Sequence, residues 1–203
     1  MAKLYFRYGA MGSSKTANAL MAKFNYNERG QQALLLKPAM ECRDGTGVIA
    51  SRAGISSPCR FVEDFYSFDD DGNIVIHKSV ETVDCVIVDE AQFLTPVQVK
   101  FLARIVDDLG IPVLCYGLRT DFQGNFFPGS GALMAVADKI EEVKTICWCG
   151  RKATHNARFN ENGVVRHGEQ FLLGGNDQYV GVCRKHFCSG EIQPHNRGGD
   201  LSD

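Results

Sequence analysis

The sequence lacks the features that mark membrane proteins and proteins that bind through bulk charge. No apolar run approaches the ~20 residues that a membrane-spanning helix needs. No charge of one sign dominates, because 22 Lys and Arg residues stand against 24 Asp and Glu residues, for a formal net charge of −2. The composition therefore gives no general electrostatic reason to bind nucleic acid or a membrane surface.

We also expect no signal peptide, since residues 1–3 lead directly into an alternating apolar stretch. This absence affects how the eight cysteines are interpreted. A secreted chain would use them in disulfides, whereas clustered Cys and His residues in a cytosolic chain favour a metal site. We expect a cytoplasmic protein. Its 203 residues, 44% of them hydrophobic, are enough for one α/β domain with a small appendage.

The segment 5–16 reads as an apolar strand, a turn of small residues and the start of a helix. Such a turn gathers unpaired backbone N–H groups at the positive end of a helix dipole, which makes a site for phosphate. In the pattern G-x-x-x-x-G-K-[ST], Lys15 would reach the β- and γ-phosphates and Thr16 would hold Mg²⁺. Ser14 replaces the second glycine of this pattern. The predicted nucleotide-binding residues are Gly9, Gly12, Ser13, Ser14, Lys15, Thr16 and, from a later strand end, Asp89.

The alternative for this segment is a Gly/Ser loop with a chance Lys-Thr pair. The strand before the loop and the helical spacing of the apolar residues after it favour the phosphate site. Gly12 offers backbone freedom close to Ser14.

The clearest buried strand, Cys85 to Val88, ends in two carboxylates. Such groups are costly to bury without a purpose. Beside a phosphate site, Asp89 would hold Mg²⁺. Strand side chains alternate, so Glu90 would face the other way and accept a proton from an attacking hydroxyl. The alternative is a pair of acids that favour the dipole of the next helix.

Further apolar runs predict a parallel sheet with flanking helices. Strands are expected at 33–36, 113–117 and 143–146, and helices at 15–27, after Thr95, and from Leu133. Arg43, in the charged loop after the strand at 33–36, is a candidate phosphate contact, with a solvated connection as the alternative. Phe122, Phe126 and Phe127 fit either an aromatic wall for a flat ring or a small satellite core.

The composition changes at Cys147. The pairs Cys147/Cys149 and Cys183/His186 flank a polar, Gly-rich segment, as the two knuckles of a structural zinc ribbon do. Cys188 is a spare candidate ligand. A closed site of four ligands would hold the base of a loop that has too few apolar residues to fold by burial alone. Free core cysteines with a surface histidine are the alternative.

The motifs together resemble the zinc-containing thymidine kinases of bacterial type. They are G-x-M-x-S-x-K-T, V-I-V-D-E-x-Q-F, Y-G-L-R-T-D-F-x-G, C-x-C-G, C-x-x-H and G-G-N-D-x-Y, and they run from Leu4 to about His186. The resemblance implies a general base at Glu90, with Lys15 and Arg43 also catalytic. It implies nucleoside contacts from Met11, Glu41, Phe93, Leu118, Phe122, Phe127, Leu172, Gly174 and Tyr179. It also implies a lasso loop over thymidine, a homotetramer and inhibition by thymidine triphosphate.

Three positions depart from the family pattern. Ser14 replaces a glycine, Glu41 stands where Asp is more usual, and Asn156 stands where Thr near the base is frequent. The first bears on nucleotide affinity and the other two on sugar and base recognition.

The sequence thus predicts a P-loop-like kinase core over 1–146, a zinc-binding lasso subdomain over 147–188 and a polar, disordered tail over 189–203. The expected reaction is phosphate transfer from ATP to the 5′-hydroxyl of thymidine, with Mg²⁺ and structural Zn²⁺ and without nucleic acid. One rival is a P-loop ATPase whose ribbon binds nucleic acid. The other is a substrate-binding protein that has lost catalysis through Ser14.

Overall fold

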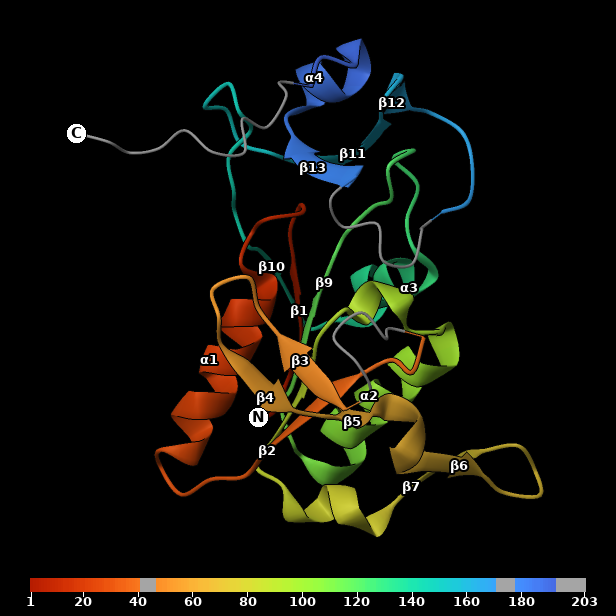
Figure 1. Ribbon diagram of the computed structural model, residues 1–203. Helices are drawn as coiled ribbons and strands as arrows, with labels where there is room; N and C mark the ends of the chain where they lie inside the picture. The colour runs from red at the N-terminus through yellow and green to blue at the C-terminus, as the bar shows by residue number, and fades with distance from the viewer. Residues whose placement is uncertain (41–46, 171–177, 193–203) are drawn as a thin grey trace.

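A computed structural model describes residues 1–40, 47–170 and 178–192 (Figure 1). Glu41, Arg43, Leu172 and Gly174 lie outside these described residues, as does the end of the predicted tail. In the described part, no helix is long and apolar enough to cross a membrane.

A six-stranded parallel sheet forms the centre of the molecule, in the order β10-β1-β9-β8-β2-β5. Its strands are β1 (Leu4–Tyr8), β2 (Ala33–Lys37), β5 (Arg60–Phe61), β8 (Cys85–Val88), β9 (Val113–Gly117) and β10 (Lys139–Glu142). The apolar run of β8 is buried along its whole length because helices cover both faces of the sheet. The predicted α/β class is confirmed.

Alternate strand residues pack into two separate cores. Val86 and Val88 face one core with α2 (Pro96–Leu109) and α3 (Pro128–Val136), whereas Cys85 and Ile87 face the other with α1 (Lys15–Asn27). The capping of α2 is as its sequence predicts, since Thr95 and Gln98 exchange side-chain-to-backbone hydrogen bonds.

Two predicted boundaries are wrong. The last strand of the sheet is β10, which immediately precedes the predicted segment 143–146. Its residues, K-I-E-E, carry the charges that protect a sheet edge from further pairing. Because three of the four are charged, the segment does not read as an apolar strand. Helix α3 begins at Pro128, well before Leu133, because proline suits the first turn of a helix.

Shorter elements complete the core domain. Two antiparallel hairpins are formed by β3 (Val48–Ala50) with β4 (Ser56–Pro58) and by β6 (Tyr66–Phe68) with β7 (Ile74–Ile76). The 3₁₀ turns in the described part of the chain are η1 (Val62–Phe65), η2 (Lys78–Thr82) and η3 (Ala91–Phe93). The β3–β4 hairpin brings residues 49–53 to the site described below.

The C-terminal subdomain, which comprises the described residues from Cys147 onward, has its own antiparallel sheet in the order β12-β11-β13. Its elements are β11 (His155–Asn160), β12 (Gly163–Val165), β13 (Tyr179–Val182) and α4 (Arg184–Ser189). They lie together beyond one end of the central sheet (Figure 1). Ala10 of the core domain packs into the same apolar cluster as Ala157 and Val182. The division at residue 146 stays a prediction.

Candidate active site

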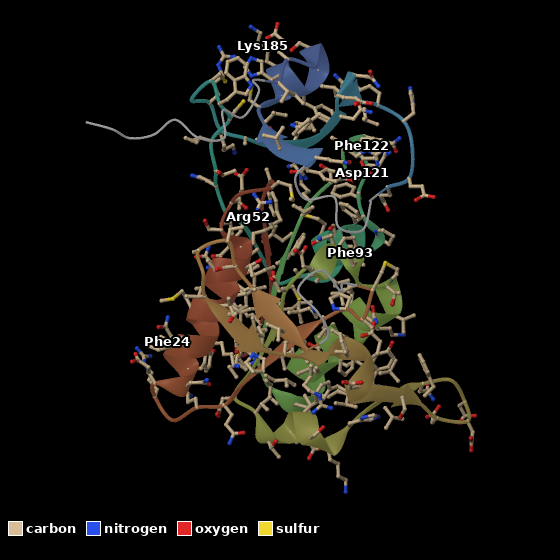
Figure 2. The ribbon with its side chains drawn as sticks, viewed as in Figure 1. Phe24, Arg52, Phe93, Asp121, Phe122 and Lys185 are labelled. Atoms are coloured by element: carbon tan, nitrogen blue, oxygen red, sulfur yellow. The ribbon has the colours of Figure 1, made fainter. Side chains whose placement is uncertain are left out.

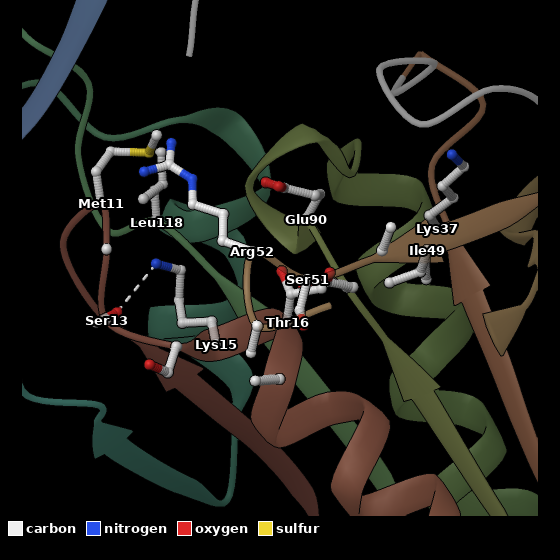
Figure 3. Close-up of a pocket in the computed structure, with 16 residues that line it drawn as sticks. Met11, Ser13, Lys15, Thr16, Lys37, Ile49, Ser51, Arg52, Glu90 and Leu118 are labelled. Atoms are coloured by element: carbon white, nitrogen blue, oxygen red, sulfur yellow. Dashed lines mark hydrogen bonds between the residues drawn. The ribbon is translucent and has the colours of Figure 1, made fainter. Parts of the chain in front are cut away.

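A cavity of about 320 Å³ lies where the strand ends of the central sheet meet the turn after β1. Its lining comprises residues 11–17, residues 49–53, Lys37, Asp89, Glu90 and Leu118 (Figure 3). Six of the seven predicted nucleotide-binding residues, together with the predicted base Glu90, therefore share one cavity. Gly9, the seventh, does not line the cavity and packs closely against Ser13 of the same turn. A side chain there would clash with Ser13 Oγ at 2.3 Å and with the Val143 carbonyl at 2.4 Å.

The turn from Gly9 to Thr16, called here the phosphate loop, has two left-handed residues. Gly12 has a φ of 75°, and Ser14 has a φ of 58° and a ψ of 24°. Glycine adopts this conformation without penalty, whereas a residue with a Cβ pays about 1–2 kcal/mol. Position 14 thus keeps the backbone of the glycine that the motif usually carries, and Ser14 is strained in that role.

Lys15 lies almost wholly inside the phosphate loop. Its Nζ donates to the Ala10 carbonyl at 2.8 Å and to Ser13 Oγ at 3.1 Å. The side chain is buried at the start of α1, so its charge is held where a bound phosphate would meet the loop's backbone N–H groups. This geometry fits the phosphate contact expected from the sequence.

Asp89 is buried at the end of β8 and accepts a hydrogen bond from the Thr16 hydroxyl. Burial raises the pKa of its carboxyl group well above the usual range, and the charge of Glu90 adds to the rise. The Thr16 contact and the Lys15 charge oppose it. A hydroxyl and a carboxylate side by side are oxygen donors of the kind Mg²⁺ takes, so these two residues fit the predicted metal role.

Glu90 differs from the sequence expectation in its backbone. The strand ends at Val88, and Glu90 adopts a left-handed conformation with a φ of 52° at the start of η3. The argument from strand alternation was therefore wrong, because Glu90 is outside the strand. Its side chain nevertheless points into the cavity (Figure 3).

Sequence reasoning missed three polar residues of the cavity. Lys37, at the end of β2, is 1% exposed and donates from Nζ to the Val48 carbonyl at 3.0 Å. Among the described residues the buried Ser51 Oγ has no hydrogen-bond partner, and Arg52 follows it along the lining (Figure 3). A lysine at the end of an apolar parallel strand was a usable signal for Lys37. Ser51 and Arg52 had none, because a hairpin carries them to the site.

The predicted aromatic residues Phe93, Phe122 and Phe127 do not line the cavity. The Phe93 and Phe127 rings meet edge to face at 5.7 Å. Phe122 is 1% exposed, beneath the Arg158 guanidinium at 4.1 Å, and lies next to the C-terminal sheet (Figure 2). Burial of Phe122 and Phe127 favours the satellite core, whereas Phe126 is exposed. Their contact with a nucleoside base stays a prediction.

The four predicted zinc ligands lie together. One ligand atom from each of Cys147, Cys149, Cys183 and His186 falls within 4.8 Å of the others. The Cys147 thiol is 3.3 Å from His186 Nδ1, and the Cys149 and Cys183 sulfurs are 3.9 Å apart. Three sulfurs and one imidazole nitrogen are the donor set of a closed, tetrahedral zinc site. Cys188 is outside this cluster.

The surroundings of the cluster suit a metal. The backbone N–H of His186 lowers the pKa of the Cys183 thiol, which favours the thiolate that binds metal. The second ring nitrogen of His186 faces Glu191 at 3.6 Å, and the Trp148 ring stacks on the imidazole at 4.2 Å. Such outer contacts fix the orientation of a ligand histidine.

The sequence model described as thymidine kinase matches residues 2–187 of this chain. The chain belongs to the thymidine kinase family. A thymidine kinase of Zymomonas mobilis is 50% identical over 92% of this chain and 96% of its own length. One of Legionella pneumophila is 48% identical, covering 97% and 96%, and one of Ruegeria pomeroyi is 49% identical, covering 98% and 100%.

Among solved structures, that of Bacteroides Pif1 bound to single-stranded DNA matches 70% of this chain and 38% of its own. Its sequence identity of 13% and TM-score of 0.42 are too low to bear on fold or function. The resemblance to the thymidine kinase family that the motifs indicated is thus confirmed by sequence relatives that match almost end to end.

Asn156, one of the departures from the thymidine kinase family pattern, joins the two parts of the chain. Its side-chain oxygen accepts from the Met11 N–H at 2.8 Å, and its nitrogen donates to the Thr120 carbonyl at 2.9 Å. Gly181 lies close by, since a Cβ there would be 2.7 Å from the Met11 carbonyl. Tyr179, on the same strand, has a buried hydroxyl without a partner among the described residues.

A second cavity, of about 680 Å³, lies on the C-terminal subdomain of this thymidine kinase family member. Among the residues that the structure describes, nine line it, and these include five cations and no acid. The cations are Arg119, Arg151, Lys152, Arg184 and Lys185. The Nζ of Lys152 forms an ion pair at 2.6 Å with Glu142, which does not line the cavity. Sequence reasoning saw no basic stripe here, because the cations come from three separate segments.

Proposed function

We propose that the chain is an ATP-dependent thymidine kinase, which transfers the γ-phosphate of ATP to the 5′-hydroxyl of thymidine. One observation carries the proposal. The phosphate loop, Asp89 and Glu90 line a single cavity in a chain that the thymidine kinase family model matches over residues 2–187.

The phosphates of ATP would lie against the backbone N–H groups of the phosphate loop, with Lys15 next to the transferring group. Thr16 and Asp89 would hold Mg²⁺, which supplies positive charge to the β- and γ-phosphates when bound. Arg52 and the Ser51 hydroxyl line the same cavity and would be further donors for phosphate oxygens. Arg43 keeps its proposed phosphate contact. These groups would stabilise the charge that develops during transfer.

Glu90 would accept the proton of the 5′-hydroxyl as that oxygen attacks the γ-phosphorus in line. A sugar hydroxyl is a weak acid, so a carboxylate within reach helps as the proton leaves. Asp89 is less suited, because Thr16 already bonds to it at the metal position. Glu90 points into the cavity from the residue position immediately before η3.

The nucleoside would lie between the two parts of the chain. Met11 and Leu118 line the cavity on the side of the C-terminal subdomain, and Tyr179 offers a buried hydroxyl nearby. The further proposed contacts are Glu41, Phe93, Phe122, Phe127, Leu172 and Gly174. Structural Zn²⁺ at the Cys₃His cluster would fix the base of the lasso segment. A homotetramer, inhibition by thymidine triphosphate and a cytoplasmic location accompany this proposal as expectations from the family.

The test is direct. Purified chain is incubated with ATP, Mg²⁺ and each deoxynucleoside in turn, and the products are separated by chromatography. We expect thymidine monophosphate and ADP in equal amounts. ATP hydrolysis without any nucleoside monophosphate would reject the proposal.

The five-cation cavity favours one second candidate, an ATPase whose C-terminal subdomain binds nucleic acid. Clustered lysines and arginines bind phosphate backbones, with an affinity that falls steeply with salt. Fluorescence anisotropy of a labelled single-stranded oligonucleotide at two salt concentrations tests it. Stimulation of ATP hydrolysis by the oligonucleotide, without phosphate transfer to thymidine, would support this second candidate.

A further inference from the structure

Gln92 has no role in the mechanism so far, yet it contacts the proposed base directly. It is 1% exposed in η3. Its Nε2 donates to Glu90 Oε2 at 2.5 Å, and its Oε1 accepts from the Leu118 N–H at 2.9 Å. Glu90 and Leu118 both line the cavity, from the ends of neighbouring strands. One side chain thus joins the proposed base to a second residue of the cavity lining.

The orientation of this amide is determined by its partners. A backbone N–H can only donate, so the Gln92 atom that faces Leu118 is the oxygen. The nitrogen must then face Glu90, where it can only donate to the carboxylate. The same geometry with a carboxylate at position 92 would place two acceptors against each other.

The surrounding backbone leaves Gln92 little freedom. A Cβ at Gly117 would lie 2.8 Å from Gln92 Oε1 and 2.9 Å from its backbone nitrogen. A Cβ at Gly129 would lie 2.5 Å from the Ala91 carbonyl and 3.0 Å from that of Gln92. Glycine at these two positions therefore allows β9 and α3 to pack directly against η3. The Leu118 carbonyl is fixed in turn by the Ser130 hydroxyl at 2.5 Å.

We propose that Gln92 is a positioning residue for phosphate transfer. Its donor nitrogen fixes the rotation of the Glu90 carboxylate, and its oxygen fixes the backbone of Leu118 in the cavity lining. Together these contacts would hold the distance between the base and the bound nucleoside constant. This inference rests on the proposed function, because it takes Glu90 as the base. A misplacement of about 1 Å at a reacting group can cost on the order of 100-fold in rate.

The two contacts can be separated by two variants. Gln92→Met removes both and keeps a similar volume, so we expect kcat to fall about 10- to 100-fold and KM for thymidine to rise. Gln92→Glu keeps an oxygen for Leu118 and loses the donor to Glu90, so kcat should fall while KM changes little. A buried Glu beside other carboxylates is protonated more readily than usual and can then donate. The kcat of Gln92→Glu relative to the original enzyme should therefore recover as the pH is lowered.

Gln98 provides a matched control. It is also buried, its Nε2 donates to Glu63 at 2.7 Å, and its Oε1 accepts from the Thr95 N–H at 2.8 Å. The same side chain thus bridges a carboxylate and a backbone N–H away from the cavity. Gln98→Met should lower thermal stability as Gln92→Met does, but leave kcat within twofold.

The outcomes separate cleanly. If the original chain transfers no phosphate to thymidine, the proposed function fails before Gln92 is tested. If it does, a kcat for Gln92→Met within twofold of the original overturns this inference. Equal losses of kcat in folded Gln92→Met and Gln98→Met would overturn it as well, because they would show a general structural effect.

Discussion

The side-chain oxygen of Asn156 accepts a hydrogen bond from the backbone N–H of Met11 at 2.8 Å. This contact ties the first strand of the C-terminal subdomain to the phosphate loop, across a long separation in sequence. The Asn156 side-chain nitrogen donates a second hydrogen bond, to the Thr120 carbonyl. The residue therefore supports the loop at the point where ATP and thymidine would meet.

Replacing Asn156 should affect both stability and nucleotide use. Asn156→Ala leaves two backbone groups without partners at a buried position, each at a cost of about 1–3 kcal/mol. We expect a lower free energy of unfolding in urea and a several-fold higher KM for ATP. Asn156→Asp keeps an oxygen for Met11 and should raise KM less than Asn156→Ala. An alanine variant with the original KM would show that the loop does not need this support.

Ser14 should limit nucleotide affinity through its backbone. Its φ of 58° is strained for any residue with a Cβ. Ser14→Gly should therefore tighten ATP binding several-fold, which corresponds to about 1 kcal/mol, whereas Ser14→Ala should not. Gly12→Ala serves as a reverse control, since a Cβ there meets nothing within 4 Å and adds backbone strain alone. Calorimetric titration with ATP measures all three. Unchanged affinity in Ser14→Gly would mean that the serine hydroxyl compensates for the strain.

The Cys₃His cluster should hold one zinc ion per chain. Elemental analysis of protein purified without chelators measures it. His186→Ala should lose the metal and also hydrogen-exchange protection across β11 and β13, because Ala157 and Val182 of these strands pack in one apolar cluster with the ligands Cys147 and Cys183. Cys188→Ala, next to the site but outside the cluster, should keep both. Retention of zinc by His186→Ala with Cys188 as the replacement ligand would contradict the assigned set.

The two carboxylates after β8 should behave differently. Glu90→Gln should lower kcat by about 10²–10⁴-fold with a small change in thymidine affinity, since the amide keeps the shape but cannot take a proton. Asp89→Asn should mainly raise the Mg²⁺ concentration needed for activity. Steady-state kinetics at several Mg²⁺ concentrations distinguishes them. A near-normal kcat for Glu90→Gln together with a large loss for Glu41→Gln would move the base to Glu41.

The parts of the site that were predictable from sequence are those encoded locally. The phosphate loop, the strand before Asp89 and the cap at Thr95 each depend on residues within a few positions of one another. Ser51 and Arg52 were missed because the β3–β4 hairpin, and not their local sequence, brings them to the cavity. The direction of the Glu90 side chain was not predicted because Glu90 itself has a left-handed backbone conformation after the strand. Glu rarely adopts this conformation, so the residue type gave no indication of it.

The central claim is that this cavity transfers phosphate from ATP to thymidine. The most direct measurement follows radiolabel from [γ-³²P]ATP into thymidine monophosphate, with the original chain and Lys15→Ala compared at equal zinc content and equal thermal stability. We predict rapid labelling of thymidine monophosphate by the original chain and almost none by Lys15→Ala, because Lys15 acts on charge that develops on the transferring group. Label in inorganic phosphate alone, or equal transfer by both proteins, would contradict the account.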